Sequence, residues 1–258
     1  MNTIHSKTAV MLFVLVAFTT LSVLTPAGAK TPSVDPAAFQ ILQRMTDFLS
    51  EQKQFSLHTQ TTYEDTLASG QRVDYDISAN VIVSRPNKIH SERIGEQLSQ
   101  FFYYDGKTLT LFNPSAKVYA TQAAPGTIEE LLDYAREELG LFVPVSDLVY
   151  RYAFHILTQD INSAIVVGKT DINGVSCNHL AFSRPDVDFQ VWVADGDQPL
   201  PCKYVVTDTT TPEQLSVSTV MSDWNVAPAT MDSMFEFVPP KDANKIDFMP
   251  LDSAKSDR

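Results

Sequence analysis

The chain has 258 residues, with 19 basic and 31 acidic side chains and a formal net charge of −12 at pH 7. Hydrophobic residues make up 44% of it, enough to build a folded core and too much for a disordered chain. Such an acidic surface repels nucleic acid and anionic membrane surfaces, and no basic cluster offsets the charge. The composition therefore excludes a nucleic-acid-binding protein.

The first 29 residues have the pattern of a secretory signal peptide. Lys7 precedes an uncharged apolar run from Ala9 to Leu24, and Ala27-Gly28-Ala29 supplies the small residues that signal peptidase accepts. The run is short for a membrane span, so a retained anchor is the weaker interpretation. We expect cleavage before Lys30 and export to the periplasm. No Cys lies near the cleavage site, so we expect no lipid modification and no stable membrane anchor.

A helix is predicted first in the mature chain. Asp35 can cap the free backbone N–H groups, and Pro36 suits the first helical position. The apolar residues that follow at helical spacing share one face: Phe39, Leu42, Met45 and Leu49. This amphipathic helix needs a partner surface to cover that face.

About six strands are predicted from Phe55 to Thr121, including residues 57–67, 73–83 and 88–94. The segment QFFYYDGKTLTLFN reads as a hairpin, because Asp105-Gly106 suits a two-residue turn with positive φ. In that register, Phe102 pairs with Leu109 on one face.

Two helices are predicted in the middle of the chain. Thr127 and Glu130 form a capping box, and Gly140 is placed to end the helix. The apolar stripe of this helix consists of Ile128, Leu131, Leu132, Ala135 and Leu139. A second, short helix is expected after Pro144, with Leu148, Val149, Tyr152 and Ile156 on its buried side.

About five more strands are predicted from Ile165 to Phe237. The clearest pattern runs from Gly174 to Val206, where Phe189 and Val191 alternate with polar neighbours between two turn-forming clusters. Three successive antiparallel strands with one apolar face are expected there.

Cys177 and Cys202 are the chain's two cysteines, and their state stays open at this point. A disulfide fits an oxidising compartment. Against it, Cys177 shares strand parity with His179, whereas Cys202 shares parity with the apolar Tyr204, so the two side chains are expected to start on opposite faces. An intervening strand also holds them too far apart for a disulfide, unless Pro199 or Pro201 bends the chain. A metal site of Cys177, His179 and Cys202 would lack an evident fourth ligand, so none is expected.

No motif points to an enzyme. The sequence contains no H-E-x-x-H, no G-x-S-x-G, no P-loop and no dinucleotide fingerprint. The acidic pairs at 129–130 and 137–138 lie on the capped helix, where a solvated face explains them better than catalysis. Trp192 and Trp224 could stack on a ligand, although an aromatic in a strand more often covers the sheet. We expect no catalytic activity, no cofactor and no metal.

Several phrases carry a family resemblance: SRPNKI, YYDGKTLTLF, PGTIEELLDYAREELG, NGVSCNHLAF, DVDFQVWVADGDQPLPCKYVVT and MFEFVPPKDANKI. They resemble a bacterial family of predicted periplasmic proteins of unknown function, DUF2092, over nearly the whole mature chain. That family is similar to the LolA/LolB-like lipoprotein carriers. The resemblance implies an α+β fold, an unclosed antiparallel half-barrel of about eleven strands with an N-terminal helix and a central helical lid. It also implies a hydrophobic groove between sheet and helices that can hold acyl chains.

We therefore expect a signal peptide over residues 1–29, one domain over residues 30–249 and a flexible tail over residues 250–258. The expected function is non-catalytic binding of a hydrophobic ligand, a lipid or acyl chain, by a carrier-like protein. The alternative is a periplasmic interaction or envelope-stress sensor module that binds an envelope protein. The candidate ligand-binding residues are Phe102, Leu109, Leu111, Phe189 and Val191 on the sheet and Leu131, Leu132, Ala135 and Leu139 on the lid.

Overall fold

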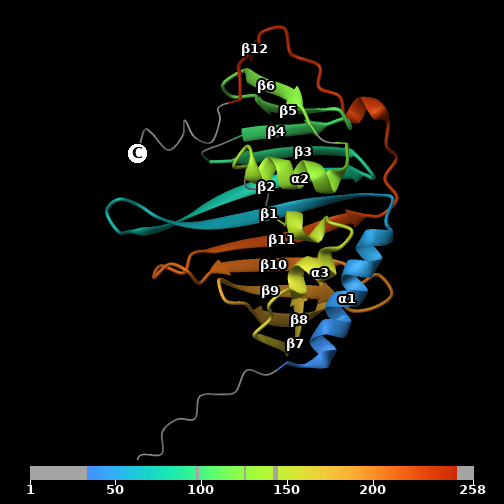
Figure 1. Ribbon diagram of the computed structural model, residues 1–258, viewed down its shortest axis with the longest axis vertical. Helices are drawn as coiled ribbons and strands as arrows, with labels where there is room; N and C mark the ends of the chain where they lie inside the picture. The colour runs from blue at the N-terminus through green and yellow to red at the C-terminus, as the bar shows by residue number, and fades with distance from the viewer. Residues whose placement is uncertain (1–33, 97–98, 125, 142–144, 249–258) are drawn as a thin grey trace, which may run out of the picture. The chain divides into compact units, whose positions relative to one another are not determined.

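The computed structural model describes residues 34–96, 99–124, 126–141 and 145–248 (Figure 1). The expected signal peptide over residues 1–29 and the expected tail over residues 250–258 lie outside the described residues. The described residues belong to one compact unit. None of the helices described is long and apolar enough to cross a bilayer.

The helices and strands follow the predicted order of helix, strands, helices and strands. Their bounds are α1 (Pro36–Glu51), β1 (Gln54–Thr66), β2 (Arg72–Ser84), β3 (Lys88–Gly95), β4 (Ser99–Tyr104), β5 (Thr108–Asn113), β6 (Val118–Ala123), α2 (Ile128–Glu137), the 3₁₀ turn η1 (Ser146–Leu148), α3 (Ala153–Thr158), β7 (Ser163–Ile172), β8 (Val175–Ser183), β9 (Val187–Ala194), β10 (Pro201–Asp208), β11 (Ser216–Asn225), η2 (Asp232–Met234) and β12 (Asn244–Lys245).

All twelve strands found in the described residues form one sheet. The order is β12-β6-β5-β4-β3-β2-β1-β11-β10-β9-β8-β7, so β12 and β7 are its two edges and the sheet does not close. Neighbouring strands are antiparallel except β12, which pairs in parallel with β6. The expected α+β fold with an unclosed antiparallel sheet is confirmed. The strand number is twelve rather than about eleven, because Asn244 and Lys245 add a two-residue strand beside β6.

Helix α1 begins and packs as predicted. The Asp35 carboxylate accepts a hydrogen bond from the Ala37 backbone N–H at 2.9 Å, which satisfies one free donor of the first turn. Leu42 and Met45 are fully buried. The helix contacts β7, β8, β9 and α3 (Figure 1), so the partner surface that its apolar face needs is the β7–β9 end of the sheet.

The capping box of α2 is also confirmed. The Thr127 hydroxyl accepts from the Glu130 N–H at 3.2 Å, and the Glu130 carboxylate accepts from the Thr127 N–H at 3.0 Å. The chain leaves the helix through Gly140, whose φ is +61°.

The second helical segment differs from the prediction. It splits into η1 and α3, and the residues that it buries are Leu148, Tyr150, Ala153 and Leu157. Tyr152 is exposed, because α3 begins only at Ala153. A single helix from Leu148 onward, which would bury Tyr152, does not form.

The β4–β5 hairpin is shifted by two residues from the predicted register. Tyr104 pairs with Leu109, and Phe102 pairs with Leu111. The turn is longer because the Asp105 carboxylate accepts from the N–H groups of Lys107 and Thr108, at 2.9 and 2.8 Å, and so organises a wider loop. A shift of two residues keeps Phe102 and Leu109 on the same face.

A disulfide joins Cys177 of β8 and Cys202 of β10. The expectation that the two side chains start on opposite faces fails because of a register shift between Pro201 and Lys203, which leaves Cys202 as an extra residue in β10. Strand parity does not carry across such a bulge. Both sulfur atoms consequently pack with Trp192 on the face of the sheet away from α1.

Candidate functional site

A cavity of about 370 Å³ lies between the β1–β5 part of the sheet and the segment that includes α2 and η1. Pockets for small molecules have volumes of roughly 300–1,000 Å³, so this one is large enough for a ligand. The lining residues come from α1 (Leu49), β1 (Phe55, Leu57, Thr59, Thr61, Tyr63), β2 (Ile77, Ala79, Val81, Val83), β3 (Ile89, Ser91, Arg93), β4 (Gln100, Phe102), β5 (Leu111), β11 (Met221, Trp224), α2 (Leu132) and the segment after it (Gly140, Leu141, Val145, Ser146, Leu148, Val149).

One end of the cavity is apolar. Phe55, Val83 and Ile89 face each other across β1, β2 and β3. The next row along the strands contains Leu57, Val81, Phe102 and Leu111, with Ser91, two residues from Arg93, as its one polar member. These two rows give this end of the cavity a mainly hydrocarbon surface.

The other end is polar, although the strands are the same. The third row holds Thr59, Ala79, Arg93 and Gln100 side by side. Beyond it, the hydroxyls of Thr61 and Thr219 bond to each other at 2.9 Å. The lining therefore changes from hydrocarbon to hydrogen-bonding groups along its length.

Arg93 and Tyr63 meet at this polar end. Arg93 Nη2 donates to the Tyr63 hydroxyl oxygen at 3.2 Å. Burial raises the pKa of the Tyr63 hydroxyl, and the Arg93 charge opposes that rise. Tyr63 is therefore neutral at physiological pH and presents a hydroxyl rather than a phenolate to the cavity.

The cover of the cavity is held to the sheet by a buried arginine. The Arg85 side chain at the end of β2 is 1% exposed; its Nη1 lies 3.3 Å from the Glu129 carboxylate of α2, and its Nη2 donates to the Val149 carbonyl at 2.5 Å. The guanidinium also lies 5.9 Å from the centroid of the Phe55 ring. Burial lowers the pKa of Arg85, and the Glu129 charge counteracts this.

The nine candidate residues are divided between the cavity and the surrounding core. Phe102, Leu111 and Leu132 line the cavity. Leu109, Leu131 and Ala135 are fully buried outside its lining, and Leu139 is partly buried against the core.

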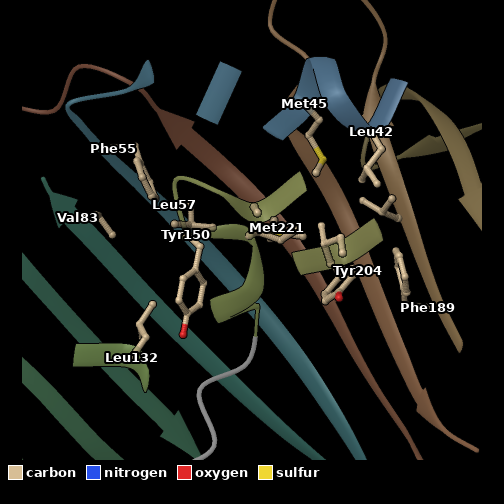
Figure 2. Packing of buried hydrophobic residues seen from close by; sticks show 14 of the residues in the cluster. Leu42, Met45, Phe55, Leu57, Val83, Leu132, Tyr150, Phe189, Tyr204 and Met221 are labelled. Atoms are coloured by element: carbon tan, nitrogen blue, oxygen red, sulfur yellow. The ribbon is translucent and has the colours of Figure 1, made fainter. Parts of the chain in front are cut away.

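Phe189 and Val191 lie in a different region, under α1. The Phe189 ring stacks on Phe182 at 4.7 Å between centroids, and Phe39 of α1 packs edge-on against Phe182 at 5.9 Å. Figure 2 shows Leu42 and Met45 of α1 pointing to the strands that carry Phe189 and Tyr204, apart from Phe55, Val83 and Leu132. The lining expected on β9 is therefore core, because α1 covers it.

The polar lining residues Thr59, Thr61, Tyr63 and Arg93 were missed from the sequence. A signal was available, since the three β1 residues share strand parity with Phe55 and Leu57, and Arg93 shares parity with Ile89. A search limited to apolar alternation passes over them.

The two tryptophans have different environments. Trp224 lines the cavity, and its Nε1 donates to the Pro201 carbonyl at 3.0 Å. Trp192 lies on the opposite face, stacked on His179 at 4.0 Å, with Lys203 Nζ 5.0 Å from its ring centroid. Of the two, Trp224 is the one that can touch a ligand in this cavity.

Cys177 and Cys202, the two sulfur ligands of the metal site considered above with His179, are joined by the disulfide. Among the described residues, no group of three or more His, Cys, Asp or Glu side chains is arranged to hold a metal ion.

The sequence matches the model of the family described as "Predicted periplasmic protein (DUF2092)" over residues 38–249. Comparison with curated protein sequences finds no match.

Solved structures with a similar chain course include LprF from Mycobacterium bovis, with 15% identity, a TM-score of 0.49 and coverage of 82% of this chain and 100% of that one. The MucA/MucB complex of Pseudomonas aeruginosa has 13% identity, a TM-score of 0.42 and coverage of 77% and 60%. A LolA superfamily protein from Nitrosomonas europaea has 11% identity, a TM-score of 0.36 and coverage of 78% and 97%. Similarity at this level transfers neither a ligand nor an activity to the present chain.

Proposed function

The chain belongs to the DUF2092 family of predicted periplasmic proteins, and we propose that it binds the acyl chain of a lipid non-covalently in the cavity beneath α2. The observation that carries the proposal is the cavity itself, about 370 Å³ in volume and lined at one end by Phe55, Leu57 and Val83. Such a lining replaces water around a hydrocarbon chain.

The expected affinity depends on chain length. Burying one methylene group contributes about 0.8 kcal/mol, which corresponds to roughly a fourfold change in affinity. A series of ligands that differ by single methylenes should therefore bind progressively more tightly until the apolar end of the cavity is full. No reaction is required, and no catalytic residue is proposed.

We further propose that the protein acts as a carrier, which takes up the lipid from one partner and releases it to another. Export by the predicted signal peptide would place the protein between two membranes, and transfer between partners requires only a difference in affinity. The cover supports this role, since polar contacts of Arg85 join it to the sheet in addition to apolar packing. Such contacts can be exchanged for water when the cover moves.

Native mass spectrometry tests the binding. The full chain is expressed with its leader in a Gram-negative host, purified from the periplasm without detergent, and measured intact. We expect a bound mass that dissociates on activation and is identified as a lipid or fatty acid after extraction. Ala79→Phe, which fills the cavity, should lose this mass, and the surface variant Val175→Phe should keep it. Ligand-free wild-type protein that also fails to take up added fatty acids would contradict the proposal.

A second candidate is binding of an envelope protein at the edge strand β7. Ile165, Val167 and Val175 are 41%, 51% and 45% exposed at this end of the sheet. An edge strand with exposed apolar side chains can accept a strand from another chain. Co-purification of an envelope protein that is lost in Val167→Lys, with no bound lipid, would favour this candidate over the carrier.

A further inference from the structure

The polar end of the cavity contains a cation without an acidic neighbour. Arg93 is the charged residue of the described lining, and none of the lining residues is acidic. Its guanidinium donates a hydrogen bond to the neutral Tyr63 hydroxyl. No ion pair within 4.0 Å involves Arg93 in the part of the chain that the structure describes.

Glu92 of β3 and Asp76 of β2 point to the other face of the sheet. Glu92 precedes Arg93 in β3 and lies 3.3 Å from His90 Nε2. Asp76 of β2 accepts a hydrogen bond from the Thr62 hydroxyl at 2.7 Å. Since successive side chains of a strand alternate between faces, these carboxylates cannot neutralise Arg93 inside the cavity.

We propose that the ligand is an anionic single-chain amphiphile, whose carboxylate binds the Arg93 guanidinium and whose chain runs toward Phe55 and Val83. This inference rests on the proposed function and specifies its ligand class. Arg93 and Ile89 lie four residues apart along β3, a rise of about 13 Å. Head group and chain would thus occupy the two chemically different ends of one cavity.

The charge selects the head group. A ligand that enters the cavity displaces water from the guanidinium, which is costly unless an anion replaces that water. The guanidinium presents donors in a planar fork that matches a carboxylate, and such charge-assisted hydrogen bonds are stronger than neutral ones. Hydroxyls of Tyr63 and Ser91 and the Gln100 amide, on the same lining, add hydrogen-bonding groups near the head group.

The net charge of −12 does not oppose this selection. Interactions between exposed charges are largely screened beyond about 8–10 Å at physiological salt, whereas a cation inside a cavity is screened much less. The acidic exterior would repel anionic membranes, and the local positive charge would still favour one anionic head group.

Calorimetric titration with three ligands of equal chain length tests the proposal: dodecanoate, dodecan-1-ol and dodecyltrimethylammonium. The titrations use purified, delipidated full-length mature protein at a pH where the carboxylate is ionised. We expect dodecanoate to bind about tenfold more tightly than dodecan-1-ol. The cationic ligand should bind most weakly.

Arg93→Met removes the charge and keeps most of the side-chain volume. It should lower dodecanoate affinity about tenfold and leave dodecan-1-ol affinity unchanged. Arg93→Lys should retain the preference for the acid. Arg72→Met, on the exposed start of β2, changes the net charge equally and should have no effect. Thermal unfolding by circular dichroism establishes that each variant is folded.

The outcomes separate the two proposals. Equal wild-type affinity for the acid and the alcohol would overturn the head-group assignment and leave acyl-chain binding intact. The same holds if Arg93→Met weakens both ligands equally. If none of the three ligands binds, acyl-chain binding itself is contradicted. Should Arg93→Met fail to fold, the preference of the wild-type protein between acid and alcohol decides the question.

Discussion

The inner face of the sheet is filled at one end and hollow at the other. Under α1, the β7–β10 strands bury Phe182, Phe189 and Tyr204 against Leu42 and Met45 of the helix. Under α2, the β1–β5 strands face a cavity of about 370 Å³. Both halves have apolar alternation, so alternation alone does not distinguish core from lining. The covering helix and the size of the facing side chains decide which of the two forms.

The two covers are also held differently. The apolar side chains of α1 pack directly onto the strands, whereas α2 and the segment after it are tied to the sheet by Arg85 as well as by Leu131 and Leu132. A ligand could enter beneath α2 at the cost of polar contacts that water can replace. Entry beneath α1 would require exposure of close-packed core.

The largest effect is expected from Arg85→Met. Loss of the guanidinium leaves the Glu129 carboxylate, 16% exposed, and the Val149 carbonyl without this partner. Removal of one member of a buried ion pair costs about 3–5 kcal/mol. Urea denaturation measures the loss of stability, and hydrogen exchange should show faster exchange in α2 than in α1. Equal acceleration in both helices would contradict the separate attachment of the two covers.

A pair of leucine substitutions compares the two halves directly. Leu42→Ala should destabilise the protein by about 2–5 kcal/mol, because a fully buried side chain leaves a new cavity. Leu57 borders the existing cavity, so Leu57→Ala should cost about 2 kcal/mol, at the low end of this range, because little new cavity is added to the transfer of the lost carbon groups. Both values come from urea denaturation. A Leu57→Ala cost equal to that of Leu42→Ala would mean that the cavity half is as tightly packed as the other.

Adding volume should reverse the comparison. Ala164→Leu, in β7 beneath α1, should cost about 1–3 kcal/mol through overpacking. Ala79→Leu projects into the cavity, so its cost should be below about 0.5 kcal/mol while dodecanoate affinity falls. Thermal unfolding and calorimetric titration of the two variants measure this. Similar destabilisation by both would rule out usable space beside Ala79.

The smallest effect concerns pH and a residue between the two regions. Asp147 of η1 has a pKa raised by burial, with Arg136 and Arg184 opposing the rise. Because the pKa is higher in the folded than in the unfolded state, the folded form binds more protons, and stability falls as pH rises above the unfolded value of about 3.9. Asp147→Asn removes this loss.

The advantage of Asp147→Asn over wild type should therefore be small at acidic pH and grow as pH rises through the folded-state pKa. Melting temperatures measured across that range check the trend. An advantage that shrinks with rising pH would show that Asp147 is stabilised in its charged form.

The sequence is informative about local structure and much less so about long-range packing. The caps at Asp35 and Thr127 and most strand segments follow from local chemistry and are found where predicted. The strands expected as far as Phe237 instead end at Asn225, and a 3₁₀ turn at Asp232–Met234 follows. Which strands α1 covers depends on tertiary packing. Phe189 and Val191 therefore looked the same as Phe102 and Leu111 in the sequence, although only the latter pair lines the cavity.

Two further features could not be predicted from the sequence: the polar part of the cavity lining and the bulge in β10. Thr59 and Arg93 do not stand out in the sequence, because apolar alternation indicates the hydrocarbon part of a lining and not its polar part. The relation between Cys177 and Cys202 depended on one extra residue in β10, which shifts every face assignment before it. Neither feature has a sequence pattern as strong as a helix cap.

Methyl NMR of selectively labelled protein tests the central claim, acyl-chain binding beneath α2, most directly. On titration with dodecanoate, we predict shift changes for the methyl groups of Leu57, Val81, Leu111 and Leu132, which line the cavity. The methyl groups of Leu42, Leu180 and Val191, packed under α1, should change little. Shifts confined to the α1 side, or no saturable shifts at all, would contradict the account.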